Sequence, residues 1–298
     1  MLGTLPCFTF DGKIILATPS EIATAPDGNG GLYAALRQPL SSSNPSHTVL
    51  TDLAKRNISF IHAYAVDNCL VRVADPVFLG HSISKQADCA AKVVPKASPE
   101  EAVGVVAVKG DVFSVVEYSE ITKEQAELRD ARGNLAFRAA NIANHFYTRA
   151  FLEQVEEFET NMVFHIAKKK IPHVDTTSGE LVKTPTKPNG IKLELFVFDV
   201  FPFAKRLVVL EVERREEFSP LKNAPGTGSD DPDTSRRDLI AQGKRFLDNA
   251  GAKVQGDDVV IEISPIVTYA GEGLDAVKGK VFSRSGYVDS VEAFDPLV

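Results

Sequence analysis

The chain has 298 residues, 44% of them hydrophobic, which is enough for one large folded unit and a smaller one. Its formal net charge of −7 argues against the clustered basic surface of a nucleic-acid-binding protein. Three cysteines without C-x-x-C spacing, no secretory signal and no apolar run of about 20 residues predict a cytoplasmic protein with free thiols and no membrane contact.

Strand-like runs rich in Val, Ile and Phe recur along the chain, and most are nearly continuous in apolar character, as in strands buried on both faces. They lie at residues 13–16, 59–66, 90–94, 103–108, 112–118, 193–198, 207–212 and 259–263. Helical patterns at residues 47–56, 75–86, 122–129 and 149–158 alternate with them. This alternation predicts an α/β fold with a mainly parallel, doubly wound, Rossmann-like sheet.

A glycine-rich loop precedes the first helical pattern. Gly28, Gly30 and Gly31 lack the Cβ atoms that keep a backbone away from a ligand. The apolar pattern that begins at Leu32 predicts a helix directly after the loop, where free backbone N–H groups suit phosphate oxygens or the edge of a base. A hairpin turn is the alternative, since Asp-Gly and Asn-Gly are strong turn signals.

The composition changes at residues 223–235, where prolines, glycines and polar residues predict a linker. An amphipathic helix is predicted over residues 233–249, with Asp233 or Thr234 as its cap and Gly251 as its stop. The chain therefore divides into a large unit of residues 1–222 and a linker with a small C-terminal domain, residues 223–298.

One strand-like run ends at Asp67, and ligands of open α/β sheets lie beyond the carboxyl ends of strands. A carboxylate there suits Mg²⁺ that bridges phosphates, and the alternative is an Asx turn that closes the strand.

Polar residues near other strand-like runs suit a sugar and a phosphate. Glu117 closes one such run, and a carboxylate accepts strong hydrogen bonds from sugar hydroxyls. Asn141 offers a donor and an acceptor for an N-acetyl amide or a hydroxyl, and the alternative is a turn residue at a strand end. His145 is predicted to be a satisfied, partly buried imidazole. Lys222 follows a segment stiffened by Pro220, and a lysine is a compact charge suited to phosphate oxygens.

A series of motifs spans nearly the whole chain in a fixed order. The motifs are Ala25-Pro26-Asp27-Gly28-Asn29-Gly30-Gly31, Val66-Asp67-Asn68, Ala74-Asp75-Pro76, Val103-Gly104-Val105-Val106, Val115-Val116-Glu117-Tyr118, Asn141-Ile142-Ala143-Asn144-His145-Phe146, Phe196-Val197-Phe198-Asp199 and Glu217-Phe218-Ser219-Pro220-Leu221-Lys222-Asn223. By these motifs the chain resembles the eukaryotic UDP-N-acetylglucosamine pyrophosphorylases, which are UTP-dependent uridylyltransferases of the nucleotide-diphospho-sugar transferase fold.

The resemblance implies a reaction in which UTP and N-acetylglucosamine 1-phosphate form UDP-N-acetylglucosamine and pyrophosphate, with Mg²⁺ as cofactor. Asp67 matches the aspartate beside the phosphates, where it is linked to the metal. Lys192 and Lys222 match lysines that face the phosphates of the nucleotide sugar. Catalysis is then implied to be positioning and charge neutralisation.

The resemblance also assigns substrate contacts. Gly28 and Asn29 match positions on the uridine and sugar side, and Gly104, Glu117 and Asn141 match positions that line the sugar pocket. The aromatic residues Phe196 and Phe198 match that pocket as well. Their alternation on a strand would place both on one face, so core packing is the alternative.

Members of this family carry a Gly-x-Gly-Thr-Arg phosphate loop followed by a lysine in an N-terminal portion, and no such motif occurs in these 298 residues. The expectation is an N-terminally truncated sheet and a chain that has no turnover by itself. Two alternatives stay open: a uridylyltransferase for another hexose 1-phosphate, and a sugar-nucleotide-binding fragment or pseudoenzyme.

Overall fold

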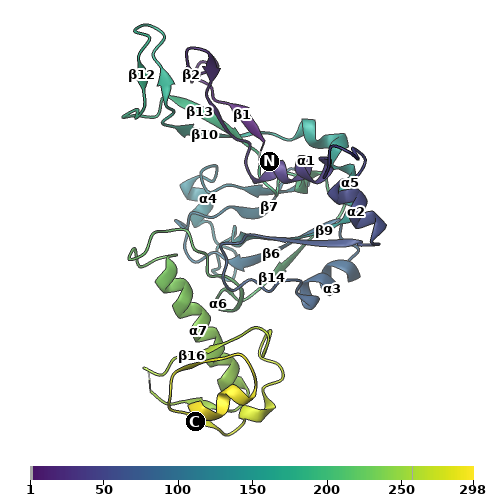
Figure 1. Ribbon diagram of the computed structural model, residues 1–298, viewed down its shortest axis with the longest axis vertical. Coiled ribbons are helices and arrows are strands. Elements are labelled where there is room, and N and C mark those ends of the chain that lie inside the picture. Colours follow the sequence, from purple (N-terminus) through teal and green to yellow (C-terminus); the bar gives the residue numbers. More distant parts are fainter. Residues whose placement is uncertain (1–2, 257) are drawn as a thin grey trace.

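The computed structural model describes residues 3–256 and 258–298. A six-stranded sheet forms its centre, an arm of hairpins projects on one side and a C-terminal unit lies on the other (Figure 1). The six strands are β5 (Phe60–Tyr64), β6 (Cys89–Pro95), β7 (Val105–Lys109), β8 (Val112–Val116), β9 (Ala139–Thr148) and β14 (Leu207–Glu211).

The central sheet is mixed, so the prediction of a mainly parallel sheet is wrong. Its strand order is β14-β6-β9-β7-β8, with β5 also paired to β9. Only β14 and β6 pair in parallel, because β9 runs against β5, β6 and β7. The sequence did not predict β9, since the polar residues Asn141, Asn144 and His145 interrupt its apolar pattern. Four strands, β5, β6, β7 and β14, still run in one direction.

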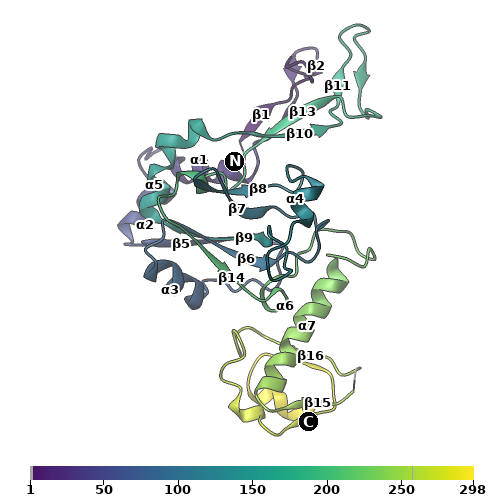
Figure 2. The same cartoon turned by 180° about the vertical axis from the view of Figure 1, so that it is seen from behind.

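Helices cover both faces of this sheet, as predicted for a doubly wound fold. On one face α1 (Leu32–Arg37), α2 (Val49–Lys55) and α5 (Arg149–Phe158) lie next to one another (Figure 2) and share a core with Cys89, Ala91 and Val93 of β6. On the other face α3 (Pro76–Ser84) buries Phe78 against Ala90. The alternation along β6 therefore buries the strand on both sides.

The projecting arm is built from antiparallel hairpins. Its pairs are β1 (Thr4–Pro6) with β4 (Thr24–Pro26), β2 (Leu16–Thr18) with β3 (Glu21–Ile22), β10 (His165–Lys169) with β13 (Gly190–Glu194), and β11 (His173–Val174) with β12 (Leu181–Val182). Phe8 and Ile191 exchange backbone hydrogen bonds of 3.1 and 2.7 Å and so join the arm's two parts. The arm delivers the glycine loop after β4 and residues 195–199 after β13.

The C-terminal unit has its own hydrophobic cluster around Leu247, Phe282, Val288 and Phe294. Its elements are α7 (Pro232–Asn249), β15 (Lys253–Val254), β16 (Ile261–Ile263), β17 (Val281–Phe282) and β18 (Gly286–Val288). The predicted helix is confirmed, but its cap is Asp231, whose side chain accepts from the backbone N–H groups of Thr234 and Gly228. The unit boundary at residue 222 stays a prediction.

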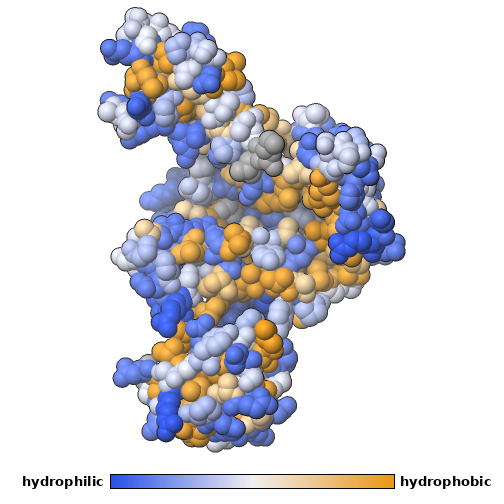
Figure 3. Space-filling view, viewed as in Figure 1, coloured by the Kyte–Doolittle hydropathy of each residue, from blue (hydrophilic) through white to orange (hydrophobic). Residues whose placement is uncertain are grey.

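Short helices connect these elements: α4 (Lys123–Glu127), α6 (Arg214–Glu217), and the 3-10 turns η1 (Asn29–Gly31), η2 (Glu159–Asn161), η3 (Phe201–Phe203), η4 (Asp275–Val277) and η5 (Glu292–Leu297). None of the helices in residues 3–256 and 258–298 combines the length and apolar character needed to cross a membrane. Hydrophobic residues are visible over the central and C-terminal units on the face shown in Figure 3.

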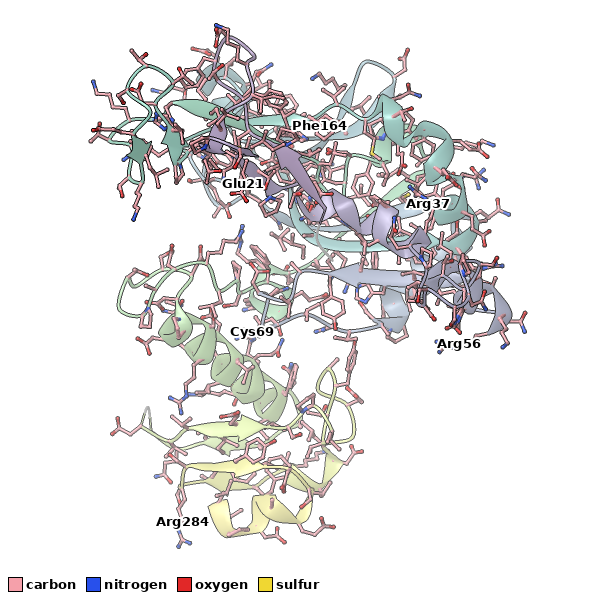
Figure 4. All side chains as sticks on the ribbon, turned by 45° about the horizontal axis from the view of Figure 1, so that its top comes forward. Glu21, Arg37, Arg56, Cys69, Phe164 and Arg284 are labelled. Atoms are coloured by element: carbon pink, nitrogen blue, oxygen red, sulfur yellow. The ribbon has the colours of Figure 1, made fainter. Side chains whose placement is uncertain are left out.

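Residues 215–219 join the sheet to the C-terminal unit. On the side of α7, the carbonyl oxygen of Glu216 accepts from Gln242 at 2.7 Å and the hydroxyl of Ser219 donates to Asp238 at 2.9 Å. On the side of the sheet, Asn68 donates to the carbonyl oxygen of Glu217 at 2.7 Å. Cys69 lies at the same junction (Figure 4), with its Sγ 3.5 Å from the carbonyl oxygen of Ser235.

Candidate functional site

A break in the central sheet marks the candidate site. Along one side of β9, β5 pairs with Asn144–Thr148 and β7 pairs with Ala140, so residues 141–143 lie between the two partner strands. The register with β6 shifts at the same point, and Ala143 has a positive φ of 49°. Bulges and positive-φ residues of this kind often occur at functional sites. Asn141 therefore lies within β9, and the alternative of a turn residue at a strand end is wrong.

Three of the predicted sugar-pocket residues meet at this break. The N–H of Asn141 donates to the carbonyl oxygen of Gly104 at 2.8 Å. A Cβ atom on Gly104 would lie 2.6 Å from Oε1 of Glu117, so the carboxylate rests directly on the glycine. Burial raises the pKa of Glu117, while His165 and Lys222 act in the opposite direction.

Glu117 also faces a cleft of about 1110 Å³ between the end of β8, the start of β10 and the segment after β13. His165, Asp199 and Phe196 line the same cleft. The Nε2 of His165 is 2.9 Å from Oδ1 of Asp199, and its Nδ1 is 3.5 Å from Oε1 of Glu120. Sequence reasoning missed this histidine, because its partner lies 34 residues away and leaves no local signal.

Asp199 also fixes Phe196, an aromatic residue that lines the cleft. Its Oδ2 accepts from the N–H of Phe196 at 2.6 Å, and its own N–H donates to the carbonyl oxygen of Phe196 at 3.0 Å. β13 ends at Glu194, so Phe196 and Phe198 lie in a turn, and their predicted placement on one strand face is wrong. Their ring centroids are nevertheless 5.2 Å apart, and that of His165 is 4.6 Å from Phe196.

The acid–base pair of His165 and Asp199 predicts a pH-dependent contribution to stability. The hydrogen bond to Asp199 raises the pKa of His165, which burial alone would lower. The stabilisation is therefore complete below the unfolded value of 6.5 and is lost as pH rises through the raised folded value. We expect His165→Gln to lower the free energy of unfolding more at about pH 6 than at about pH 9, measured by urea denaturation. His81→Gln, a half-buried change on α3, should show no such difference, because the His81 side chain has no ion pair among the described residues. Equal losses at both pH values for His165→Gln would contradict the prediction.

The glycine loop packs against the same turn. The N–H of Leu195 donates to the carbonyl oxygen of Asp27, and the N–H of Gly30 donates to that of Leu195, both at 2.8 Å. Oδ1 of Asn29 accepts from the N–H of Val197 at 2.8 Å. The loop runs into η1 and α1, so the predicted helix is confirmed and the hairpin alternative is wrong.

Gly28 is the glycine of this loop with a positive φ. Its φ of 90° and ψ of 176° belong to a region that is essentially restricted to glycine, and a Cβ would lie 2.3 Å from the carbonyl oxygen of Leu195. We expect Gly28→Ala to reduce stability by more than the roughly 1–3 kcal/mol of backbone strain alone. Gly12→Ala is the matched control, because Gly12 has a φ of 84° with nothing within 4 Å of its Cβ position. Equal losses of unfolding free energy in urea would show that Leu195 does not constrain the loop.

Asp67 and Lys222 are neighbours at the carboxyl end of β5. The carbonyl oxygen of Asp67 accepts from the N–H of Leu221 at 2.8 Å, and Oδ1 of Asn68 accepts from the N–H of Ser219 at 2.9 Å. Within the described residues, neither the carboxylate of Asp67 nor the ammonium group of Lys222 has a hydrogen bond or ion-pair partner. Both charges are therefore available to a ligand, and Lys222 acts electrostatically on Glu117.

The residues at this point fit a magnesium ion that is shared with a phosphate. A half-buried, unpaired carboxylate such as that of Asp67 is the kind of single protein ligand that Mg²⁺ uses beside phosphates and water. In the part of the chain that the structure describes, no group of three or more His, Cys, Asp or Glu residues could hold a metal ion. The fit therefore depends on oxygen atoms from the bound substrate.

Lys192 lies apart from these groups. It occupies the middle of β13, opposite Ala167, and does not line the cleft. Burial raises the pKa of the Cys7 thiol, and Lys192 acts against this increase, which places its charge on the arm near Cys7. Its assignment to the phosphates stays a prediction.

Comparisons with known proteins identify the family of the chain. A family model described as UTP–glucose-1-phosphate uridylyltransferase matches residues 3–269. The chain is 50% identical to UDP-N-acetylhexosamine pyrophosphorylase-like protein 1 of Homo sapiens, over 98% of this chain and 59% of that protein. It is 45% identical to the UDP-N-acetylglucosamine pyrophosphorylase of Saccharomyces cerevisiae, over 96% of this chain and 59% of that protein.

Solved structures give the same result. The UDP-N-acetylglucosamine pyrophosphorylase of Trypanosoma brucei matches with a TM-score of 0.78 and 34% identity, over 92% of this chain and 56% of that one. A crystal structure from Entamoeba histolytica assigned to the same enzyme matches with a TM-score of 0.82 and 33% identity, over 97% of this chain and 69% of that one.

The matched model and the shared fold define a protein of the uridylyltransferase class. The chain belongs to the UTP–glucose-1-phosphate uridylyltransferase family, and within it to the UDP-N-acetylhexosamine pyrophosphorylases, which confirms the resemblance drawn from its motifs. It spans 59% of the length of both curated relatives named above.

Proposed function

We propose that this chain provides the sugar-nucleotide site of an enzyme that forms UDP-N-acetylglucosamine and pyrophosphate from UTP and N-acetylglucosamine 1-phosphate. The observation that carries the proposal is the break in the sheet, where Gly104, Glu117 and Asn141 meet beside the carboxyl end of β5. A carboxylate and an amide suit the hydroxyl and N-acetyl groups of the sugar. Ligands bind at such crevices in α/β sheets.

The phosphate chemistry follows from the charges on either side of this break. The phosphate oxygen of the sugar attacks the α-phosphorus of UTP in line, the bond to pyrophosphate breaks, and pyrophosphate leaves. Lys222 binds the phosphate oxygens and stabilises the charge that develops on them, and Lys192 contributes a second positive charge. Asp67 holds Mg²⁺, which neutralises phosphate charge when bound. The chain itself thus positions the reactants and forms no covalent intermediate.

On the other side of the site, Gly28 lets the loop backbone approach the uridine, and Asn29 faces the uridine and sugar. Phe196 and Phe198 form the aromatic wall that the bound sugar contacts. The close packing of this turn on the glycine loop supports a single pocket for both parts of the ligand.

Asn141→Ala tests the sugar end of the proposal. In an enzyme that carries the family's phosphate loop ahead of these residues, the change should raise KM for N-acetylglucosamine 1-phosphate much more than KM for UTP. A buried hydrogen-bond partner left unpaired costs roughly 1–3 kcal/mol, which corresponds to a change of about 5- to 150-fold. Equal increases for both substrates would remove Asn141 from the sugar pocket. Asn134→Ala, an exposed change ahead of β9, is the control.

Two other functions stay open as proposals. A uridylyltransferase for another hexose 1-phosphate would show itself in assays with a panel of sugar phosphates. A binding protein without turnover is favoured by the absence of Gly-x-Gly-Thr-Arg from these residues. Release of pyrophosphate from UTP by a polypeptide of residues 1–298 would exclude it, and we expect none, because oxyanion stabilisation by such a loop is typically the largest catalytic term. A cytoplasmic location is part of the same proposal.

A further inference from the structure

Asn29 and Asn141 bond to the protein in the same way. Oδ1 of Asn29 accepts from the N–H of Val197, and Oδ1 of Asn141 accepts from the N–H of Ala143 at 3.2 Å. Because a backbone N–H can only donate, the accepting atom must be oxygen in both side chains. Neither Nδ2 group has a hydrogen-bond partner among the described residues, so each side chain offers an N–H donor to a ligand.

A buried chain of hydrogen bonds connects the two amides. Nε2 of His145 is 3.0 Å from Oδ1 of Asn141, and the hydroxyl of Tyr147 is 3.1 Å from Nδ1 of His145. The Tyr147 hydroxyl is also 3.1 Å from that of Tyr33 and 3.0 Å from the carbonyl oxygen of Val197. The hydroxyl of Tyr33 donates to the same carbonyl. Val197, whose carbonyl oxygen ends this series of hydrogen bonds, donates its own N–H to Oδ1 of Asn29.

One arrangement of the protons satisfies every acceptor in this series of hydrogen bonds, including the buried carbonyl of Val197. Since Oδ1 of Asn141 is an acceptor, Nε2 of His145 must carry the proton, and its Nδ1 must accept. Tyr147 therefore donates to Nδ1, and the proton of Tyr33 satisfies the carbonyl of Val197. His145, Tyr33 and Tyr147 are each 1% exposed, and burial lowers the pKa of His145 to about 3, so the imidazole stays neutral.

We propose that His145, Tyr147 and Tyr33 are positioning residues that hold the Asn29 and Asn141 amides together, with both Nδ2 groups presented as paired donors to acceptor oxygens of one bound sugar nucleotide. The choice of ligand rests on the proposed function. The positioning itself rests on the hydrogen bonds above, since the three side chains are too deeply buried to touch a ligand.

Tyr33→Phe gives the sharpest test, because Tyr33 has no hydrogen bond to His145 or Asn141 among the described residues. Without the Tyr33 hydroxyl, Tyr147 has one proton for two acceptors, the carbonyl oxygen of Val197 and Nδ1 of His145. Whenever that proton turns to the carbonyl, the imidazole proton moves to Nδ1 and the bond from Nε2 to Oδ1 of Asn141 is lost, so the Nδ1–H form gains population. The variant should therefore change the tautomer of a histidine that it does not touch.

The tautomer is measured by ¹⁵N NMR of the histidine side chains in the 298-residue polypeptide without ligand, with His145 assigned from the spectrum of His145→Gln. We expect the neutral Nε2–H form in the unchanged chain and a shift toward Nδ1–H in Tyr33→Phe. Tyr269→Phe is the matched control, since the hydroxyl of Tyr269 also donates to a backbone carbonyl, that of Val73, at 3.0 Å. An Nδ1–H form in the unchanged chain, or a Tyr33→Phe spectrum identical to that of the control, would overturn the proposal.

Binding of UDP-N-acetylglucosamine, measured by calorimetry, tests the consequence for the ligand. Tyr33→Phe should weaken it about tenfold, the size of one hydrogen bond, and Tyr269→Phe should not change it. A changed tautomer with unchanged affinity would overturn the positioning role and leave the proposed function standing. If the unchanged polypeptide fails to bind UDP-N-acetylglucosamine, the proposed function and the ligand named here are overturned. The tautomer of His145 then still decides whether the hydrogen bonds from Asn141 to Val197 exist.

Discussion

Lys222→Ala should lower turnover by about 10²–10³-fold, the size of effect seen when one donor to a developing oxyanion is removed. The ammonium group of Lys222 is exposed and has no partner within the described residues, so nothing in the fold depends on its charge. Pyrophosphate release at saturating Mg²⁺ and UTP measures the effect, in an enzyme that carries the family's phosphate loop ahead of residue 1. The free energy of unfolding should change by less than about 0.5 kcal/mol, as for other exposed substitutions.

Lys205→Ala is the control for this change. Lys205 is also exposed and unpaired in the described part of the chain, but it lies in the turn before β14, away from Asp67. Its replacement should leave turnover unaltered. Near-normal turnover of Lys222→Ala would remove the lysine from the phosphate site, and a large loss in both variants would point to the net charge of the protein instead.

Lys92→Ala should destabilise the fold by about 3–5 kcal/mol, because it removes the cation from the buried carboxylate of Asp75 and leaves Glu217 with the more distant Arg72, at 3.6 Å. Lys92 is fully buried in β6, and its Nζ is 2.5 Å from Oδ2 of Asp75 and bonded to Oε2 of Glu217. Although burial alone would raise the pKa of Asp75, the contact with Lys92 holds it below 3.8. Because the folded pKa of Asp75 is lowered, the stabilisation by the ion pair is fully present above the unfolded value of 3.8 and is lost as pH falls through the folded pKa. The loss in the variant should therefore be largest near neutrality and smaller under acid conditions.

Urea denaturation of Lys92→Ala and Lys96→Ala distinguishes the loss of buried ion pairs from the loss of a buried lysine that has no ion pair. Lys96 is 8% exposed, but its Nζ donates to the carbonyl oxygen of Pro99 at 3.0 Å and to no carboxylate among the described residues. Its removal should cost about 1 kcal/mol with little dependence on pH, as for a single hydrogen bond. Similar losses in the two variants would show that the ion pairs of Lys92 contribute no more than an ordinary contact.

The local sequence pattern was enough to predict the strands and helices whose apolar residues follow a regular spacing. β6 and β14 were found from continuous apolar runs, and α3 was found from Asp75 followed by Pro76, which cap its first turn. The glycine loop and the helix after it were also predicted correctly, because the φ of 90° at Gly28 requires a residue without a Cβ.

The features that could not be predicted from the sequence are those that depend on residues far apart in the chain. β9 was missed because its polar residues bond across the sheet, as Asn144 does with His62 82 residues earlier at 2.6 Å. Strand direction has no local signal, so the antiparallel pairing of β9 with three strands could not be predicted. Lys92 reads as an interruption of an apolar strand until Glu217, 125 residues later, is placed beside it. Asp67 and Lys222 likewise come together only through the bond between Asp67 and Leu221.

The joint at residues 215–219 has a mechanical consequence for the lysine that follows it. The N–H of Lys222 donates to the carbonyl oxygen of Asp230 at 2.7 Å, while the N–H of Leu221 donates to the carbonyl oxygen of Asp67 in the turn after β5. The backbone on either side of that peptide is thus anchored to a different body of the molecule. The backbone position of Lys222 is therefore set by the sheet side and by the C-terminal unit at once. The small unit thus helps to hold in place the lysine that we propose faces the phosphates.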